Sequence, residues 1–242
     1  MTVLAGSRAA SAALVAAIGL AHAHLGRVVS AMTEEQVAEP SRLPGWSRGH
    51  DVAHLTELAA AVTRQIEAAR AGELVEVYEG GRPARDAAIE ARAPASAQAH
   101  ERSLRRATAE IGVLLASLAP ADWDLPVRYR DGVVRTVVQA WWREVEIHTV
   151  DLDLGAEPDG WSEAFCAQTV EFLAPRVPAG TTLVLEAPDG WVRELGAGAG
   201  SGVRRVVRGE RTDLVAWLAG REPVHPVRAD DDGALPALDP WP

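Results

Sequence analysis

Apolar residues recur at helical spacing along four long stretches of the chain. Leu14, Ile18 and Leu25 fall on one helix face in the first stretch, about 5–32. The same spacing covers about 48–71 and 96–118, and a fourth stretch follows Val133 and ends at Gly155. Four amphipathic helices in succession predict a four-helix bundle, in which each helix turns its apolar face inward.

Shorter segments connect these helices. Residues 33–42 are predicted to be a polar connection, and residues 72–97 to be irregular or short-helical. The segment Val127–Val133 contains Asp131 followed by Gly132, a dipeptide typical of tight turns between strands, so we expect a short hairpin there.

The pattern changes after Gly155, where a stretch containing Gly and Pro indicates a domain boundary. We place the first domain at 1–156 and a second at 157–242. The second domain is predicted to mix helices with antiparallel strands. Its expected elements are helices at 162–173 and 212–218 and strands at 181–185, 190–192 and 203–207. The predicted fold class is therefore α+β, with an N-terminal four-helix bundle followed by a small α+β C-terminal domain.

Charge and cysteine content exclude several classes of function. The 242 residues carry 24 basic and 34 acidic side chains, a net charge of −10. We therefore expect no nucleic-acid partner, which would require a basic surface. The single cysteine, Cys166, excludes an internal disulfide and a cysteine-rich metal site. Its apolar neighbours predict a buried thiol rather than a nucleophile.

The N-terminal stretch allows two interpretations. Arg8, the Ala-rich run to Leu20 and the small residues beyond it resemble a signal peptide with a cleavage site. The run is mostly Ala, however, and its larger apolar residues keep helical spacing. We therefore favour an amphipathic first helix and expect a cytoplasmic protein with no membrane partner. Export is the alternative.

Candidate chemistry lies on the fourth helix. Glu144 and His148 are four residues apart and thus neighbours on one face, where they offer an oxygen and a nitrogen to a divalent metal. Asp151 shares this face and is expected to steady a ligating ring. The alternative is a solvated Glu–His pair on an exposed helix. The apolar residues around the pair, including Trp141 and Val145, favour burial.

The second helix supplies a histidine to the same site. His54 lies in an apolar run and should face the core, whereas His50 lies in the first turn, where exposure is expected. We therefore predict His54 as the third ligand and His50 as a surface or supporting residue. Three protein ligands with one open position are typical of catalytic zinc sites. His100, on the third helix, is predicted to lie at the surface.

Four segments of this sequence resemble one known family. They are LPGWSRGH at 43–50, RDAAIE at 85–90, REVEIHTVDL at 143–152 and WLAGR at 217–221. Together they resemble the mycothiol-dependent maleylpyruvate isomerases, which belong to the DinB-like superfamily of metal-binding four-helix bundles. The resemblance implies that the N-terminal domain is a DinB-like bundle. It also places the family's metal ligands on His54, Glu144 and His148.

The resemblance implies an activity and two cofactors. The cofactors are Zn²⁺, or another divalent metal, and the thiol mycothiol. The activity is the isomerisation of maleylpyruvate to fumarylpyruvate in gentisate-type aromatic degradation. A coordinated thiol loses its proton more readily than a free one, whose pKa is about 8.5. The thiolate is expected to add to the cis double bond, after which rotation and elimination give the trans isomer and return the thiol.

The substrate of this reaction has two carboxylates, for which Arg85 and Arg221 are the expected cationic partners. An important arginine of the family's C-terminal domain falls on Arg221, although the same residue could instead cap its helix. The expected partners are therefore a small dicarboxylate and a low-molecular-weight thiol, bound by a monomer. Two alternatives remain open: a metal-dependent mycothiol S-transferase that releases a conjugate, and a non-catalytic DinB-like binding module.

Overall fold

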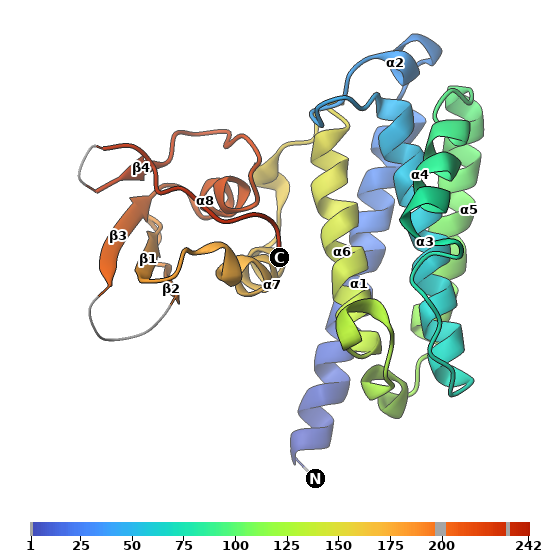
Figure 1. Cartoon of the computed structure of the whole chain (residues 1–242), viewed down its shortest axis with the longest axis horizontal. Coiled ribbons are helices and arrows are strands. Elements are labelled where there is room, and N and C mark those ends of the chain that lie inside the picture. Colours follow the sequence, from blue (N-terminus) through green and yellow to red (C-terminus); the bar gives the residue numbers. More distant parts are fainter. Residues whose placement is uncertain (1, 197–201, 231–232) are drawn as a thin grey trace. The chain divides into compact units, whose positions relative to one another are not determined.

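The structure is a computed structural model that describes residues 2–196, 202–230 and 233–242. It divides into two compact units, Met1–Ala156 and Glu157–Pro242. The first unit is helical, and the second combines helices with a small sheet (Figure 1). The predicted α+β fold class is therefore confirmed.

Four long helices form the first unit. They are α1 (Thr2–Ser30), α3 (Arg48–Arg70), α5 (Ala97–Ala116) and α6 (Val134–Asp151), and they lie within a few residues of the predicted ranges. The helices α1 and α3 each pack against both α5 and α6, so the four form a closed bundle (Figure 1). Its core contains apolar residues from all four helices, among them Leu25, Leu55, Ile66, Leu104, Ile111 and Trp141.

Two short helices lie in the connections of the bundle. The first, α2 (Glu34–Ala38), occupies part of the segment predicted to be a polar connection. Its signal is the sequence Thr-x-x-Gln, because Thr33 Oγ1 accepts the amide proton of Gln36 and Gln36 Oε1 accepts that of Thr33. The second, α4 (Gly81–Arg92), lies in the segment predicted to be irregular or short-helical, and it packs against α3.

The hairpin predicted at 127–133 is wrong. This segment contains a 3-10 helix, η2 (Tyr129–Asp131), and is closed by the isolated β-bridge between Pro126 and Val133. Arg130 and Asp131 both adopt left-handed backbone conformations, with φ of 56° and 48°, and these coil the loop instead of continuing two strands. Another 3-10 helix, η1 (Pro120–Asp124), precedes this loop.

His100 is buried in α5, so the prediction of a surface position is wrong. Its Nε2 lies 3.1 Å from the carbonyl oxygen of Ala93, just after α4. The turn that carries Ala93 comes close to α3 because Gly49 has no side chain, and a Cβ at Gly49 would collide with the Ala93 oxygen. The imidazole thus satisfies a buried carbonyl, a role that helical spacing cannot reveal.

One described helix is long and apolar enough to cross a membrane, namely the segment Ala9–Ser30 of α1. A core helix of a soluble protein and an N-terminal signal sequence meet the same criterion, so this property is weak evidence. In the structure α1 packs along α5 and α6 and buries Ile18, Leu25 and Val29. This arrangement agrees with the predicted amphipathic helix.

The second unit contains a four-stranded sheet with the helices α7 (Glu163–Leu173) and α8 (Arg211–Leu218), which pack against each other. The strands are β1 (Thr181–Glu186), β2 (Val192–Gly196), β3 (Val203–Arg208) and the two-residue β4 (Arg228–Ala229), which the sequence pattern did not predict. Short 3-10 helices, η3 (Pro158–Gly160) and η4 (Ala174–Arg176), flank α7. Cys166 is buried in α7, as its neighbours indicated.

The prediction of antiparallel strands is wrong for one pair. The strand order is β2-β1-β3-β4, and β1 is antiparallel to β2 but parallel to β3, with Thr181 opposite Val203. β3 does not extend the hairpin beside β2. It pairs with the opposite edge of β1, where its direction makes the pairing parallel. In addition, β2 begins at Val192, later than predicted, because residues 187–191 form the turn.

Candidate metal centre

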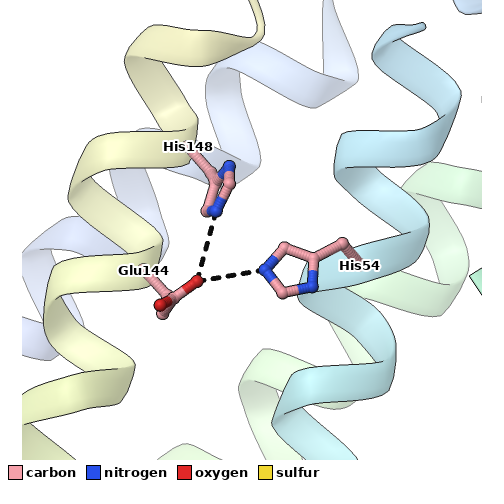
Figure 2. A group of neighbouring side chains, drawn as sticks. All are labelled: His54, Glu144 and His148. Carbon is pink, nitrogen blue, oxygen red and sulfur yellow. Dashed lines mark hydrogen bonds and ion pairs between the residues drawn. The ribbon is translucent and has the colours of Figure 1, made fainter. Parts of the chain in front are cut away.

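The facing sides of α3 and α6 bring the three predicted ligands together. Figure 2 shows His54 pointing from α3 toward Glu144 and His148 on α6. Glu144 Oε2 lies 3.0 Å from His54 Nε2 and 3.2 Å from His148 Nε2, and the three ligand atoms lie within 4.8 Å of one another. The four-residue spacing on α6 and the apolar run around His54 on α3 produce this convergence.

These distances fit a divalent metal. In a tetrahedral site with bonds of about 2.0–2.1 Å, neighbouring ligand atoms are roughly 3.3 Å apart. The two contacts of Glu144 therefore have the length of edges of such a tetrahedron. His54 and His148 are 5% and 8% exposed, whereas the Glu144 side chain is 36% exposed. The set thus has the donor types of a catalytic zinc site, with one side open to a further ligand.

Without a metal, protons lie between these side chains. Burial lowers the pKa of His54, against the opposing effect of its hydrogen bond to Glu144, so the ring is neutral at pH 7. Burial also acts to lower the pKa of His148, but the neighbouring carboxylates of Asp51 and Glu144 outweigh it and raise the pKa to about 10. For Glu144, burial acts to raise the pKa, but contacts with the two histidines hold it well below its usual range. Binding of a metal at His148 Nε2 would therefore be coupled to the loss of a proton from the ring.

Two acidic side chains lie behind His148. Asp51 Oδ1, from α3, and Asp151 Oδ2, from α6, are each 3.3 Å from His148 Nδ1, and both residues are fully buried. A ligating histidine commonly turns its second nitrogen toward such a carboxylate. Asp151 is the supporting residue that the sequence indicated. Asp51 was not singled out, although an acidic residue three positions before His54 in an apolar run is a visible signal.

Arg85, on α4, directly contacts one of the predicted ligands. Its Nη2 lies 3.0 Å from His54 Nδ1, and its Nη1 donates to Asp86 at 2.7 Å. Its guanidinium carbon lies 5.8 Å from the ring centroids of both Trp46 and Tyr78, so two aromatic rings hold the cation. Sequence reasoning selected Arg85 for a substrate carboxylate and did not foresee its contact with His54.

A second arginine near the site, Arg143, precedes Glu144 on α6 and is buried. Burial lowers its pKa to about 10, whereas Tyr129 and Glu144 favour its charged form. Arg143 is therefore a cation at neutral pH, next to the ligand set. The sequence did not indicate this role, because its partner Tyr129 lies in the loop that was predicted wrongly.

His50 lies apart from the ligand set. Its Nδ1 accepts the amide proton of Ser47 at 3.2 Å and lies 2.8 Å from Ser47 Oγ. Its Nε2 lies 3.4 Å from Glu90. These contacts fix the first turn of α3, which is a structural role at the helix end.

Arg221 lies in the second unit, just after α8. Its Nη1 donates to the carbonyl oxygen of Ala219 at 3.2 Å, and its guanidinium lies 6.0 Å from the ring of Trp241. Arg176 donates to the neighbouring carbonyl of Leu218 at 2.6 Å. Carbonyls at a helix C-terminus lack partners within the helix, so these contacts agree with the capping alternative. Binding of a substrate carboxylate by Arg221 stays a prediction.

Family models match both units of the chain. The model described as the mycothiol maleylpyruvate isomerase N-terminal domain matches residues 18–153, and the model of the corresponding C-terminal domain matches residues 160–240. Two solved structures are also similar. The crystal structure of the mycothiol-dependent maleylpyruvate isomerase has a TM-score of 0.83 and 23% identity, over 96% of this chain and 97% of that chain. A histidine-to-alanine variant of that isomerase gives a TM-score of 0.82 and 22% identity with the same coverage. At this level of identity the two structures show a shared fold. No curated protein matches the sequence.

Proposed function

Because the chain belongs to the mycothiol-dependent maleylpyruvate isomerase family, we propose that it is a metal- and mycothiol-dependent maleylpyruvate isomerase. The reaction is the cis–trans isomerisation of maleylpyruvate to fumarylpyruvate. The observation that carries the proposal is the convergence of His54, Glu144 and His148 within the bundle that the family model matches. We further expect the enzyme to act as a cytoplasmic monomer, with no nucleic-acid or membrane partner.

His54, Glu144 and His148 are proposed to hold one divalent ion, which we expect to be Zn²⁺. When bound, the ion would lower the pKa of the mycothiol thiol, so that its thiolate is available at neutral pH. The chain has one cysteine, Cys166, and that thiol is fully buried in α7 of the second unit. The nucleophile therefore has to come from an external thiol, which supports mycothiol as cofactor.

Binding of a metal to His54 changes what Arg85 can contact. In the structure, the neutral His54 ring donates its Nε2–H to Glu144 and accepts a hydrogen bond from Arg85 at Nδ1. A ring that gives its Nε2 lone pair to a metal carries its proton on Nδ1. Since Nδ1–H and the guanidinium are both donors, Arg85 would then have to leave His54. The released guanidinium is available to a substrate carboxylate beside the metal centre.

The reaction needs positive charge at two stages. Both substrate carboxylates require cationic partners, for which we propose Arg85 and Arg221. Addition of the thiolate to the double bond moves its electron pair onto the conjugated carbonyl, giving an enolate. The two carbons of the former double bond are then joined by a single bond, about which the molecule can rotate. Loss of the thiolate from the rotated enolate restores the double bond in the trans form. Buried Arg143, beside Glu144, adds positive charge that favours the anionic enolate.

The test of this proposal is turnover of maleylpyruvate with and without mycothiol. Ultraviolet absorbance follows the substrate, and a titration of free thiol follows the cofactor in the same reaction. We expect isomerisation that requires mycothiol and leaves its concentration unchanged. Loss of one thiol per turnover, with a conjugate as product, would indicate the mycothiol S-transferase instead. Absence of turnover in the metal-loaded protein would indicate the non-catalytic binding module.

A further inference from the structure

Asp51 is a buried acid without an ordinary hydrogen-bond partner. It is 0% exposed, and neither of its oxygens makes a hydrogen bond to any residue that the structure describes. Its Oδ1 lies 3.3 Å from His148 Nδ1, a nitrogen that also lacks a hydrogen bond of normal geometry among the described residues. A carboxylate removed from water without compensation is strongly unfavourable. Its position inside the bundle therefore calls for a compensating positive charge nearby.

The position of that charge follows from the two nitrogens of His148. The ring turns Nδ1 toward Asp51 and Nε2 toward Glu144 and His54. A metal on the Nε2 side keeps the proton on Nδ1 and makes that N–H a stronger donor. The long contact to Asp51 would then become a charge-assisted hydrogen bond, and the buried acid would have its partner.

Asp51 holds His148 from the opposite helix. Asp151 lies three residues after His148 on α6, so its contact stays within one helix. Asp51 lies on α3, three residues before His54. The contacts therefore cross between the helices in both directions, from His54 of α3 to Glu144 of α6 and from His148 of α6 to Asp51 of α3. The spacing of the two helices and the orientation of His148 are thus fixed together.

We propose that Asp51 is a positioning residue of the metal centre. Together with Asp151 it accepts the Nδ1–H of His148, and so it fixes both the ring orientation and the tautomer that presents Nε2 to the ion. This inference rests on the proposed metal site and adds a residue outside the set of ligands. It follows that the Asp51 carboxylate raises the affinity of the folded protein for zinc.

A purely structural role is the competing explanation. Asp51 lies in the first turn of α3, where an acidic side chain stabilises the helix through its dipole. In that case, loss of the carboxylate lowers the stability of the metal-free protein and leaves the zinc affinity of the folded protein unchanged. The two explanations therefore predict different zinc affinities for the same variants.

The test compares zinc affinity and metal-free stability in three variants. Asp51→Val removes the carboxylate, whereas Asp51→Asn keeps the shape of the side chain and removes its charge. Asp213→Asn is the matched control, because Asp213 is an equally buried acid that contacts His225 at 3.0 Å in the second unit. Competition with a chromophoric chelator measures zinc affinity, and thermal unfolding after metal removal measures stability.

We expect zinc to bind Asp51→Val about ten- to a hundredfold more weakly than wild type, with Asp51→Asn between the two. The unfolding midpoint of the metal-free variants reports the structural contribution of Asp51 separately, because the carboxylate lies 3.3 Å from His148 Nδ1 without a metal as well. The Asp213→Asn control should leave zinc affinity unchanged. Equal zinc affinity in wild type and in the Asp51 variants would overturn the inference.

Failure of the metal site itself gives a different result. If the wild-type protein binds no zinc, the proposed metal centre is wrong, and the Asp51 inference falls with it. If wild type binds zinc and the Asp51 variants bind it equally well, the Asp51 inference alone is wrong. Should Asp51→Val not fold, the closely isosteric Asp51→Asn decides the question.

Discussion

At the scale of single residues, we propose that His54 links metal binding to substrate binding. Its Nε2 contacts Glu144 and its Nδ1 contacts Arg85. With a metal held at Nε2, the ring would carry its proton on Nδ1, and the contact between Nδ1 and Arg85 would be lost. Arg85 is held between two aromatic rings, so it stays close to the metal centre after it leaves His54. A substrate carboxylate would therefore meet an Arg85 Nη2 that His54 no longer occupies only in the metal-loaded enzyme, while Nη1 keeps its contact with Asp86.

Replacing Arg85 by Ala should affect the binding of zinc and the binding of maleylpyruvate differently. Zinc affinity should stay the same or rise a few-fold, because the metal no longer has to displace a hydrogen bond worth about 1 kcal/mol. The KM for maleylpyruvate should rise roughly ten- to a hundredfold, through loss of a charge-assisted contact of about 1.5–3 kcal/mol. Arg82→Ala, at an exposed position of the same helix, is the control and should change neither quantity. Loss of zinc from the Arg85 variant would show that Arg85 supports the metal site instead.

The burial of a residue could be predicted from the sequence where the residues next to it in the chain determine that burial. His54 could be preferred to His50 because the first lies within an apolar run and the second at a helix start. Asp51, His100 and Arg143 could not be understood in this way. Each is buried by another segment of the chain, namely α6, the turn after α4 and the η2 loop respectively.

At the scale of elements, α1 and α6 are joined by a hydrogen bond that requires a neutral histidine. Trp141 Nε1, on α6, donates to His22 Nε2, on α1, at 2.8 Å. Burial lowers the pKa of His22 from its ordinary value of 6.5 to about 4. Protonation of the ring would place a second donor opposite the indole N–H and break the link between the two helices.

This pair predicts a stability of the bundle that depends on pH. The unfolded chain takes up a proton on His22 below pH 6.5, whereas the folded chain does so only below about 4. Between these values the unfolded state binds more protons, so the free energy of unfolding falls as the pH decreases. For one group the slope is at most about 1.4 kcal/mol per pH unit.

His22→Gln should reduce this slope, because glutamine still accepts a hydrogen bond from Trp141 but does not titrate. Urea unfolding at several pH values between 6.5 and 4 measures the difference from wild type. The comparison isolates His22, since His54 and His100 also have lowered pKa values and act in both proteins. Identical slopes for the two proteins would exclude a contribution from His22.

Arg221, which follows α8, has two possible roles: it binds a substrate carboxylate, or it caps the C-terminus of α8. If Arg221 binds a substrate carboxylate, Arg221→Ala should lower kcat/KM roughly ten- to a hundredfold and leave the unfolding midpoint unchanged. If it caps α8 through Ala219, the variant should unfold at lower temperature with normal kinetics per folded molecule. Arg176→Ala is the matched control, because Arg176 donates to the carbonyl of Leu218 and has no proposed catalytic role. Whichever role Arg221 has, Arg176→Ala should unfold at lower temperature and keep normal kinetics per folded molecule.

Elements were predictable in proportion to their length. The four long helices keep an apolar stripe over many turns, and that stripe determines both their existence and their inward faces. The parallel pairing of β1 with β3 and the two-residue β4 depend on which edges meet in space. The hairpin predicted at 127–133 was wrong for a similar reason, because left-handed conformations at Arg130 and Asp131 override the turn preference of Asp-Gly.

At the scale of the whole molecule, an acidic chain carries a site with local positive charge. The net charge is −10, yet Arg85 and Arg143 lie beside the proposed ligands. The proposed recognition of a dianionic substrate would therefore depend on a few placed guanidinium groups rather than on the overall field of the protein. The division of the chain into a ligand-bearing bundle and a second unit agrees with the two family models that match it.

The central claim is that His54, Glu144 and His148 hold the metal on which isomerisation depends. The most direct measurement removes metal from the purified protein with a chelator and returns zinc in small steps. Maleylpyruvate isomerisation is followed at each step with mycothiol present. The same titration is performed on His54→Ala and, as control, on His50→Ala, whose histidine lies at the helix start outside the ligand set.

Activity should rise in proportion to added zinc and level off at about one ion per chain, as expected for a single site with three protein ligands. His50→Ala should follow the same curve, whereas His54→Ala should stay inactive throughout and retain little zinc. Full activity in the metal-free wild type, or a normal titration curve for His54→Ala, would contradict the account.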